Sequence, residues 1–219
     1  MGLRSALRNA RDVIRTGPVH FNLPLLRTEL LVDHRASKRR FFAEMLPKGG
    51  IGAEIGVFTG LFSVVLLDVT KPKLAYFVDP WWKAFGPNYP DWGDYTDHGR
   101  LSASVAYETA VKRIKSHAGT SKTEVRVECS TEFYESIPDR HFDWVYVDAG
   151  HTYDGMVSEL AALRSKMKPG GIISGDDWTE DPTHYHHGIA KAVSEAVDSG
   201  EFERIGTYPL IIQWAIRAP

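Results

Sequence analysis

The chain has 219 residues, 43% of them hydrophobic and 25% charged, which is ordinary for a globular domain with a sizeable core. Its formal net charge of -2 at pH 7 gives no reason to expect nucleic acid as a partner. No apolar run approaches the roughly 18 residues of a membrane span, and the single Cys129 excludes an internal disulfide and fits a reducing compartment. We therefore expect a cytoplasmic protein that binds neither nucleic acid nor a membrane.

Residues 1–46 are interpreted as an N-terminal helical extension. Four arginines recur at helical spacing within residues 1–15, without the apolar stretch of a secretory signal. This pattern favours a solvated helical face, and an arm that docks a partner or a membrane surface is the alternative. Pro18 and Pro24 are expected to break the extension, and residues 36–45 are predicted to form a helix.

Strand-like and helix-like segments alternate from residue 47 to residue 219. Helices are predicted at 61–69, 101–117, 131–137, 153–167 and 189–197. Strands are predicted at 51–55, 74–78, 124–127, 142–147 and, after a sharp turn at 169–171, 172–173, with further runs at 202–208 and 210–216. This alternation predicts an α/β fold with a mostly parallel sheet. Because only Pro209 separates the last two runs, they should be antiparallel if they pair with each other.

Residues 81–99 form a long segment without periodicity, in which aromatic side chains stand among Gly, Pro and Asp. Segments of this kind are often lids or binding loops, and plain packing of a long loop is the alternative. Trp144 and Trp214 lie inside predicted strands and are expected in the core.

Acidic side chains lie where four of the predicted strands end: Glu54, Asp79, Asp148 and the pair Asp176-Asp177. In an open α/β sheet, ligands bind in the crevice outside the carboxyl ends of the strands. The carboxylates should therefore gather in one crevice. Because like charges repel, we expect a cationic group among them.

The turn Glu54-x-Gly56-x-x-x-Gly60 follows a strand and begins a helix, and its glycines allow a ligand to approach the backbone. It is not the dinucleotide fingerprint, and its carboxylate would repel a phosphate but attract an ammonium or sulfonium group. Asp79, after the second strand, could accept hydrogen bonds from ribose hydroxyls. S-adenosylmethionine, a cationic nucleoside without phosphate, fits both residues.

Four segments, in this order, resemble the class I S-adenosylmethionine-dependent methyltransferases, over about residues 50–217. They are Ala53-Glu54-Ile55-Gly56-Val57-Phe58-Thr59-Gly60, Val78-Asp79-Pro80-Trp81, Val147-Asp148-Ala149-Gly150-His151-Thr152-Tyr153 and Lys168-Pro169-Gly170-Gly171. The chain is most similar to the small bacterial members whose fourth strand ends in Asp-Gly-Asp-His-x-Tyr. The resemblance implies a Rossmann-like, seven-stranded, mostly parallel sheet with an antiparallel last strand, helices on both faces, and a methyltransferase domain at 47–219.

The resemblance also implies a cofactor site. The residues that would face the methionine part are Glu54, Gly56, Phe58, Thr59 and Gly60. Asp79 would hold the ribose, Ser130 would lie near the adenine, and Asp148 would lie beside the cofactor.

Asp148, Asp176 and Asp177 form an oxygen-rich set that suits Mg²⁺ or another hard divalent cation. Catechol-type O-methyltransferases, by resemblance, hold their ion with acids at these positions. A bound ion would lower the pKa of a substrate hydroxyl and orient it. His151, where those enzymes place a Lys, could act as the general base. At Gly150 the chain departs from its closer relatives, which have a second Asp, so a metal-independent mechanism stays open.

Acceptor contacts are expected from the loops around this site. The candidate residues are Trp81, Trp82, Tyr153, Trp178 and His184. His184 belongs to a run that extends to His187, whose spacing matches no closed zinc site, so an exposed loop or a substrate-facing wall is favoured.

The expected function is transfer of a methyl group from S-adenosylmethionine to a hydroxyl of a small-molecule acceptor, such as a sugar, a phenol or a polyketide-like compound, assisted by a divalent metal. One alternative is a metal-independent O- or N-methyltransferase that uses His151 as base. Alternatives of another class are a nicotinamide-dependent oxidoreductase and a non-catalytic nucleoside-binding module. The oligomeric state stays open, and a homo-oligomer is one alternative.

Overall fold

The protein is described by a computed structural model that covers residues 22–219, with the side chains of 29–38 left out. The basic segment 1–15 and Pro18 lie outside the described residues. None of the helices described is both long and apolar enough to cross a membrane.

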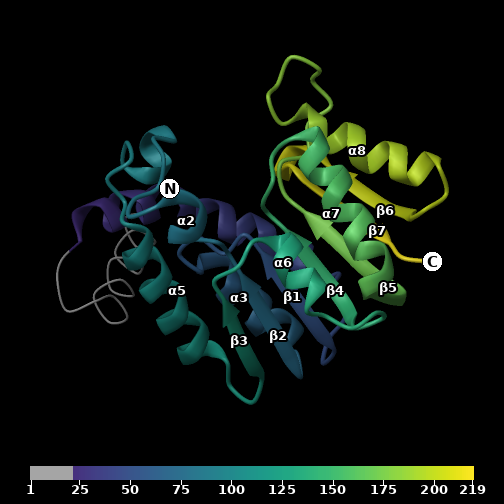
Figure 1. The fold of residues 1–219 in the computed structure, drawn as a ribbon, viewed down its shortest axis with the longest axis horizontal. Helices are drawn as coiled ribbons and strands as arrows, with labels where there is room; N and C mark the ends of the chain where they lie inside the picture. Colours follow the sequence, from purple (N-terminus) through teal and green to yellow (C-terminus); the bar gives the residue numbers. More distant parts are fainter. Residues whose placement is uncertain (1–21) are drawn as a thin grey trace.

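A seven-stranded sheet forms the centre of the molecule, in the order β3-β2-β1-β4-β5-β7-β6 (Figure 1). The strands are β1 (Ile51–Ile55), β2 (Leu74–Val78), β3 (Lys122–Arg126), β4 (Phe142–Val147), β5 (Met167–Gly175), β6 (Glu203–Tyr208) and β7 (Gln213–Arg217). Strands β1 to β5 are parallel, and β7 is antiparallel to both β5 and β6. The predicted mostly parallel sheet with an antiparallel last strand is therefore confirmed.

Helices cover both faces of this sheet (Figure 1). They are α2 (Leu23–Ala43), α3 (Leu61–Thr70), α4 (Trp82–Phe85), α5 (Ala103–His117), α6 (Ser130–Glu135), α7 (Tyr153–Lys166) and α8 (His187–Asp198), with 3₁₀ turns η1 (Gly93–Thr96) and η2 (Pro209–Ile211). Strand β4 shows how the layers form. Val145 and Val147 pack under α6, α7 and α8, whereas Trp144 and Tyr146 pack on the opposite face under α2 and α3.

Helix α2 is longer than the sequence predicts. It begins after Asn22, whose side chain accepts a hydrogen bond from the Leu25 amide (2.9 Å). The prediction that Pro24 breaks the segment was wrong, because proline in the first turn of a helix forfeits no internal hydrogen bond. Near the other end of α2, Phe42 packs in the core with α3 and β4. The domain boundary expected at residue 46 stays a prediction.

Strand β5 also differs from the prediction. The sharp turn expected at 169–171 lies inside a strand that runs from Met167 to Gly175, and the pairing with β4 shifts register between Phe142 and Trp144. The Pro-Gly-Gly segment thus lies at a bulge-like irregularity, where the regular pairing of β5 with β4 is interrupted. Trp144 and Trp214 are fully buried, as expected.

Candidate functional site

The carboxyl ends of β1 and β4 meet at Gly56. The Asp148 amide donates to the Ile55 carbonyl (2.7 Å), and the Gly56 amide donates to the Val78 carbonyl (2.8 Å). Gly56 has a φ of +90°, and a Cβ added there would lie 2.0 Å from the Asp148 carbonyl oxygen. Glycine is therefore required for the close approach of the two strand ends, in addition to any approach by a ligand.

Glu54 lies inside this junction, with 2% of its surface exposed. Its Oε2 accepts a hydrogen bond from the Ser63 hydroxyl of α3. Burial raises the pKa of Glu54 well above its usual range, the Ser63 bond opposes the shift, and the charge of Asp148 adds to it. The ionised form of Glu54 is thus disfavoured by burial, and a cationic ligand beside it would stabilise that form.

Asp79 holds the glycine turn together. One oxygen accepts the amides of Val57 (2.9 Å) and Phe58 (2.8 Å), and the other accepts the amide of Trp81 (2.8 Å). Burial raises the pKa of Asp79, and these three bonds oppose the shift. A carboxylate has about four lone-pair positions, so roughly one remains for the ribose hydroxyl that the sequence predicts.

An aromatic group from residues 81–99 lies against this turn. Phe58 stacks on Tyr95 (centroids 4.8 Å apart) and meets the ring of Tyr89 edge-on (5.1 Å). The Tyr89 hydroxyl is buried without a hydrogen-bond partner. Burial, and then the charge of Asp79, raise the pKa of Tyr89 above its ordinary value. A buried hydroxyl without a partner beside Asp79 fits a site that binds a polar nucleoside.

Arg39, near the end of α2, is the cation among the carboxylates. Its Nη1 lies 2.9 Å from Asp148 Oδ2, and its Nη2 pairs with Asp176 Oδ2. Burial alone would lower the pKa of Arg39, but the facing Tyr146, Asp148 and Asp177 raise it above the ordinary value. The guanidinium is therefore charged, although its residue is only 8% exposed.

Asp176 has partners on both carboxylate oxygens. Besides the Arg39 pair, its Oδ1 accepts a hydrogen bond from the Gln213 side-chain amide, and its backbone carbonyl accepts the indole N–H of Trp214 (3.0 Å). The Gln213 carbonyl in turn accepts the Tyr146 hydroxyl (2.8 Å). A connected network therefore fixes Asp176 between β4, β7 and α2.

The predicted metal ligands do come together. Asp148, Asp176 and Asp177 each offer an oxygen, and these atoms lie within 4.8 Å of one another. The donor type and spacing fit a hard divalent ion. Arg39 nevertheless pairs with two of the three, so these carboxylates offer an ion a complete set of ligands only when Arg39 leaves.

The third carboxylate, Asp177, binds two histidines. Asp177 Oδ2 lies 2.6 Å from His151 Nδ1, and Oδ1 lies 3.2 Å from His186 Nδ1, while the two imidazoles stack 4.9 Å apart. The hydrogen bond to Asp177 raises the pKa of His151, against the effect of burial. Burial would raise the pKa of Asp177, but its bonds to both histidines hold it well below the usual range.

The bond from Asp177 also fixes the tautomer of His151. A carboxylate only accepts hydrogen bonds, so Nδ1 carries a proton, and in the neutral imidazole Nε2 is the free base. His151, Asp177 and His186 also form a second group of possible metal ligands within 4.8 Å. The residues expected to act as base and to bind metal thus lie side by side at the ends of β4 and β5.

Four other predicted site residues, Ser130, Trp81, Trp178 and Thr59, are buried or hydrogen-bonded within the protein. Ser130 donates to Glu159 of α7 at the start of α6. Trp81 and Trp178 are buried, and the Trp81 indole donates to the Phe58 carbonyl (3.0 Å), so these two rings offer no surface to an acceptor in this arrangement. Thr59 is buried, and its carbonyl accepts a hydrogen bond from Arg113 (3.0 Å).

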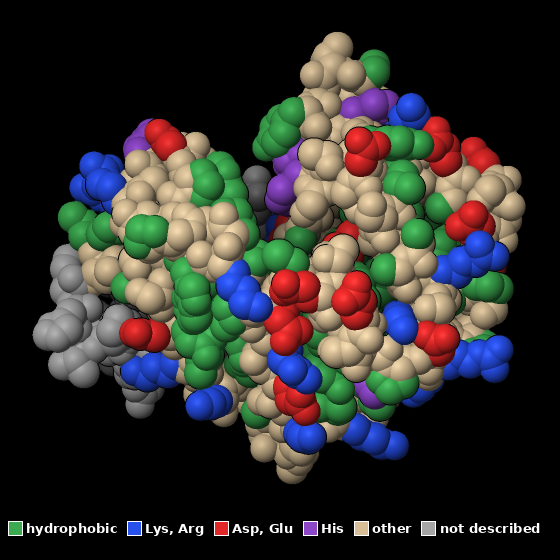
Figure 2. All heavy atoms as spheres, in the orientation of Figure 1, with side chains coloured by type: hydrophobic (Ala, Val, Ile, Leu, Met, Phe, Trp, Pro, Cys, Tyr) green, Lys and Arg blue, Asp and Glu red, His purple; other side chains and the backbone are tan. Residues whose placement is uncertain are grey.

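The remaining predicted acceptor residues keep exposed surface. Trp82 is exposed and meets Tyr107 edge-on (5.0 Å). The Tyr153 hydroxyl donates to Glu195 of α8 (2.6 Å). His184 is exposed and stacks on Tyr185 (4.8 Å). Figure 2 shows histidine side chains along one wall of the notch at the upper edge of the molecule, on the side of α8. Their roles toward an acceptor stay predictions.

Sequence reasoning missed three residues of the network: Arg39, His186 and Gln213. Gln213 carried a signal, because it is the one polar residue in the strand-like run 210–216. His186 was grouped with an exposed histidine run, although its side chain is only 12% exposed. Arg39 stands in a basic stretch of α2 where nothing in the sequence singles it out.

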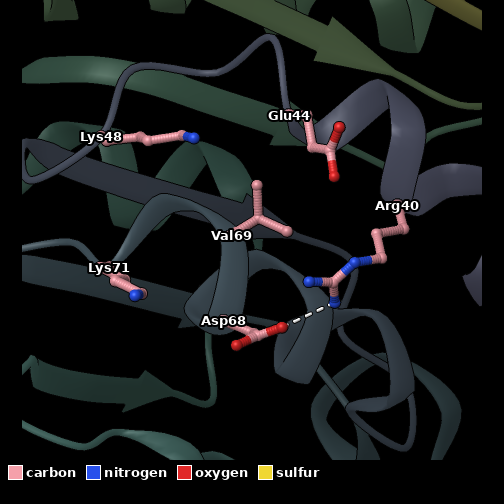
Figure 3. Close-up of a pocket in the computed structure, with 6 residues that line it drawn as sticks. All are labelled: Arg40, Glu44, Lys48, Asp68, Val69 and Lys71. Carbon is pink, nitrogen blue, oxygen red and sulfur yellow. Dashed lines mark ion pairs between the residues drawn. The ribbon is translucent and has the colours of Figure 1, made fainter.

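A separate hollow is lined by Arg40, Glu44, Lys48, Asp68, Val69 and Lys71 (Figure 3). It is bounded by the ends of α2 and α3, and an ion pair between Arg40 and Asp68 (2.6 Å) lies beside it. None of the residues that line this hollow belongs to the group of acidic residues and histidines at the strand ends. It takes no part in the candidate site.

The sequence profile of a family described as a methyltransferase domain matches residues 53–178. No curated protein sequence matches the chain significantly. Solved structures with a similar fold include the O-methyltransferase TomG of Streptomyces achromogenes, involved in tomaymycin synthesis and bound to S-adenosylmethionine (TM-score 0.53, 16% identity, covering 98% of this chain and 90% of that one). A putative methyltransferase of Streptococcus mutans bound to S-adenosylhomocysteine has a TM-score of 0.55 at 10% identity (91% and 100% covered). A protein of Corynebacterium glutamicum has a TM-score of 0.60 at 10% identity (97% of each chain).

Proposed function

Because the chain belongs to the family of S-adenosylmethionine-dependent methyltransferase domains, we propose that it transfers a methyl group from S-adenosylmethionine to a hydroxyl of a small-molecule acceptor. The structurally similar TomG is named as an O-methyltransferase, which supports oxygen as the nucleophile. The nicotinamide alternative has no support from the turn at Glu54, whose buried carboxylate would repel a pyrophosphate.

The cofactor binds where β1 and β2 end. Glu54 supplies negative charge toward the methionine ammonium, and Asp79 keeps about one lone-pair position for a ribose hydroxyl. The unpaired Tyr89 hydroxyl and the exposed part of Phe58 border the same turn. This placement leaves the methyl group directed toward the ends of β4 and β5, where an acceptor would meet it.

The pairing of His151 with Asp177 at 2.6 Å is the observation that carries the proposal. Nε2 of neutral His151 removes the proton of the acceptor hydroxyl as the oxygen attacks the methyl carbon. The O–C bond forms, the C–S bond breaks, and its electron pair stays on sulfur, giving neutral S-adenosylhomocysteine. Asp177 orients the imidazole and stabilises the imidazolium, as a carboxylate does in other histidine-dependent sites.

Two forms of this mechanism follow from the carboxylates. In the metal-assisted form, Asp148, Asp176 and Asp177 would hold a divalent ion that lowers the pKa of the hydroxyl. In the metal-independent form, His151 alone removes the proton. The ion pairs of Arg39 with Asp148 and Asp176 favour the metal-independent form. The divalent ion that the sequence suggests remains a prediction.

The proposal is tested in two steps. Calorimetric titration with S-adenosylhomocysteine should give a dissociation constant near about 1 μM, a binding free energy of about -8 kcal/mol. Labelled S-adenosylmethionine is then offered with a panel of phenols and sugars. His151→Ala should abolish most of the turnover at neutral pH but leave cofactor affinity unchanged, whereas His117→Ala, on the exposed end of α5, should alter neither. Absence of cofactor binding would refute the proposal, and equal turnover in both variants would remove His151 as the base.

A further inference from the structure

We propose that the guanidinium of Arg39 takes the place of a divalent cation in this site, so that the protein carries its own resident cation on α2. The inference rests on the proposed function, because it concerns the acceptor side of the same crevice. It assigns Arg39 as a positioning residue that fixes two carboxylates, and it makes the wild-type protein independent of metal.

The first support is the geometry of the ion pairs. Arg39 uses one terminal nitrogen for Asp148, at 2.9 Å, and the other for Asp176. Its two forked donors thus bridge two strand ends, as a metal ion bridges oxygen ligands. The guanidinium also lies over the ring of Phe62, 5.5 Å from its centroid, which fixes it from the side of α3.

The second support is that the pairing leaves no oxygen of Asp176 without a partner. Oδ2 faces Arg39, Oδ1 faces the Gln213 amide, and the residue is 2% exposed. A divalent ion such as Mg²⁺ binds oxygen at about 2.0–2.1 Å and would have to displace one of these partners. Displacing Arg39 would leave its charge buried without a counter-charge, which is strongly unfavourable.

The third support is the position of α2, the helix that carries Arg39, relative to the family domain. Arg39 lies outside residues 53–178, the part of the chain that the family profile matches. Helix α2 is nevertheless anchored on the domain, because Leu25 packs with α5, and Phe42 and Ala43 pack with α3 and β4. The acidic residues therefore lie within the part of the chain that the family profile matches. Arg39, which neutralises two of them, lies on α2, a packed helix that precedes this part.

The decisive experiment measures metal binding, not turnover. Mn²⁺ is titrated calorimetrically, or by electron paramagnetic resonance, into protein saturated with S-adenosylhomocysteine. Wild-type protein should not bind Mn²⁺ at concentrations up to about 1 mM, where even weak carboxylate sites begin to fill. Arg39→Met keeps a flexible apolar stem and frees the carboxylates of Asp148 and Asp176. This variant should bind Mn²⁺ at least about tenfold more tightly than the wild-type protein, a gain of about 1.4 kcal/mol in binding free energy.

Matched variants make the result specific. Arg40→Met removes the neighbouring arginine, which pairs with Asp68 at the surface, and should bind Mn²⁺ no better than wild type. Asp176→Asn added to Arg39→Met should abolish the new binding. Arg39→Lys retains the positive charge and should exclude Mn²⁺ as the wild type does. If Arg39→Met fails to fold, Arg39→Lys and the wild type still decide.

Two results would overturn the inference. One is tight Mn²⁺ binding by wild-type protein, and the other is a folded Arg39→Met variant that binds S-adenosylhomocysteine but no Mn²⁺. Neither result depends on the acceptor. The proposed function fails separately, if S-adenosylhomocysteine does not bind or if no acceptor is methylated.

Discussion

Arg39 Nη1 and Asp148 Oδ2 lie 2.9 Å apart and join the end of α2 to the end of β4. The same arginine pairs with Asp176 at the end of β5. The negative charge that gathers at the carboxyl edge of the sheet is thus partly neutralised from within the chain. The energetic consequences of this arrangement can be measured without knowing the acceptor.

Asp176→Ala should lower the free energy of unfolding by about 3–5 kcal/mol, because it leaves the buried guanidinium of Arg39 with one counter-charge fewer. Gln213→Leu removes only the neutral partner of Asp176 and Tyr146, and should cost about 1–3 kcal/mol. Urea denaturation of the two variants measures both values. Equal losses would show that the charge pair adds nothing beyond its hydrogen bonds.

Asp79→Ala should weaken S-adenosylhomocysteine binding by about 1–3 kcal/mol, since it removes a charge-assisted hydrogen bond to the ribose and frees the amides of Val57 and Phe58. Calorimetry gives the change directly. Asp68→Ala, at an exposed acid that lines the separate hollow of Figure 3, is the control and should bind the cofactor normally. Unchanged affinity in Asp79→Ala would exclude the ribose assignment.

The rate of methyl transfer should rise with pH through a value above the usual pKa of histidine, about 6.5. The reason is that His151 must be deprotonated to act as base, and its bond to Asp177 raises its pKa. Asp177→Asn removes the carboxylate charge, so the midpoint of the pH–rate profile should move to lower pH while the maximal rate falls. A profile that moves to higher pH, or does not move, would contradict this role of Asp177.

Gly56→Ala should reduce stability and cofactor affinity more than Gly86→Ala does, although both glycines have positive φ, +90° and +73°. A Cβ at Gly86 meets nothing within 4 Å, so this substitution costs only the strain of its backbone conformation (φ +73°, ψ −152°), about 1–3 kcal/mol. At Gly56 the new Cβ would also collide with the Asp148 carbonyl. Urea denaturation and cofactor calorimetry compare the pair, and similar losses in both measurements would argue against a tight junction of β1 and β4.

Phenolic acceptors should be methylated faster than sugars if Arg39 replaces the metal. A phenol has a pKa of about 10, as in tyrosine, so an imidazole can remove its proton during attack. An aliphatic hydroxyl has a pKa closer to that of water, about 16, and needs the stronger polarisation that a bound ion provides. Competition between matched phenol and sugar acceptors tests this, and preference for the sugar would speak for a metal-bound form.

The sequence locates the acidic edge of the site well. Glu54 lies near the end of a recognisable strand, and Asp79, Asp148 and Asp177 each follow one; parallel strands bring their carboxyl ends to one edge of the sheet. The fold class and the antiparallel last strand follow from the same local patterns and from the family resemblance.

The partners of those acids are less predictable. Arg39 reaches Asp148 across 109 positions of sequence, and Gln213 reaches Asp176 across 37, so both contacts depend on how distant elements pack. Helix periodicity places Arg39 on a helix but does not say which neighbour it faces. For Trp81 the sequence predicts too much. Its position in a long loop suggests a contact with the acceptor, whereas its ring is buried in the core.

The network around Asp176 also bears on how the protein is made. One partner, Arg39, precedes β5 in the chain, whereas Gln213 and Trp214 follow β5 and emerge from the ribosome later. Until then β5 lacks its neighbour β7, and the acidic pair at its end lacks part of its hydrogen-bonding environment. Nascent protein should thus acquire the cofactor-binding turn before it acquires a finished acceptor side, and catalytic competence should follow the synthesis of β7.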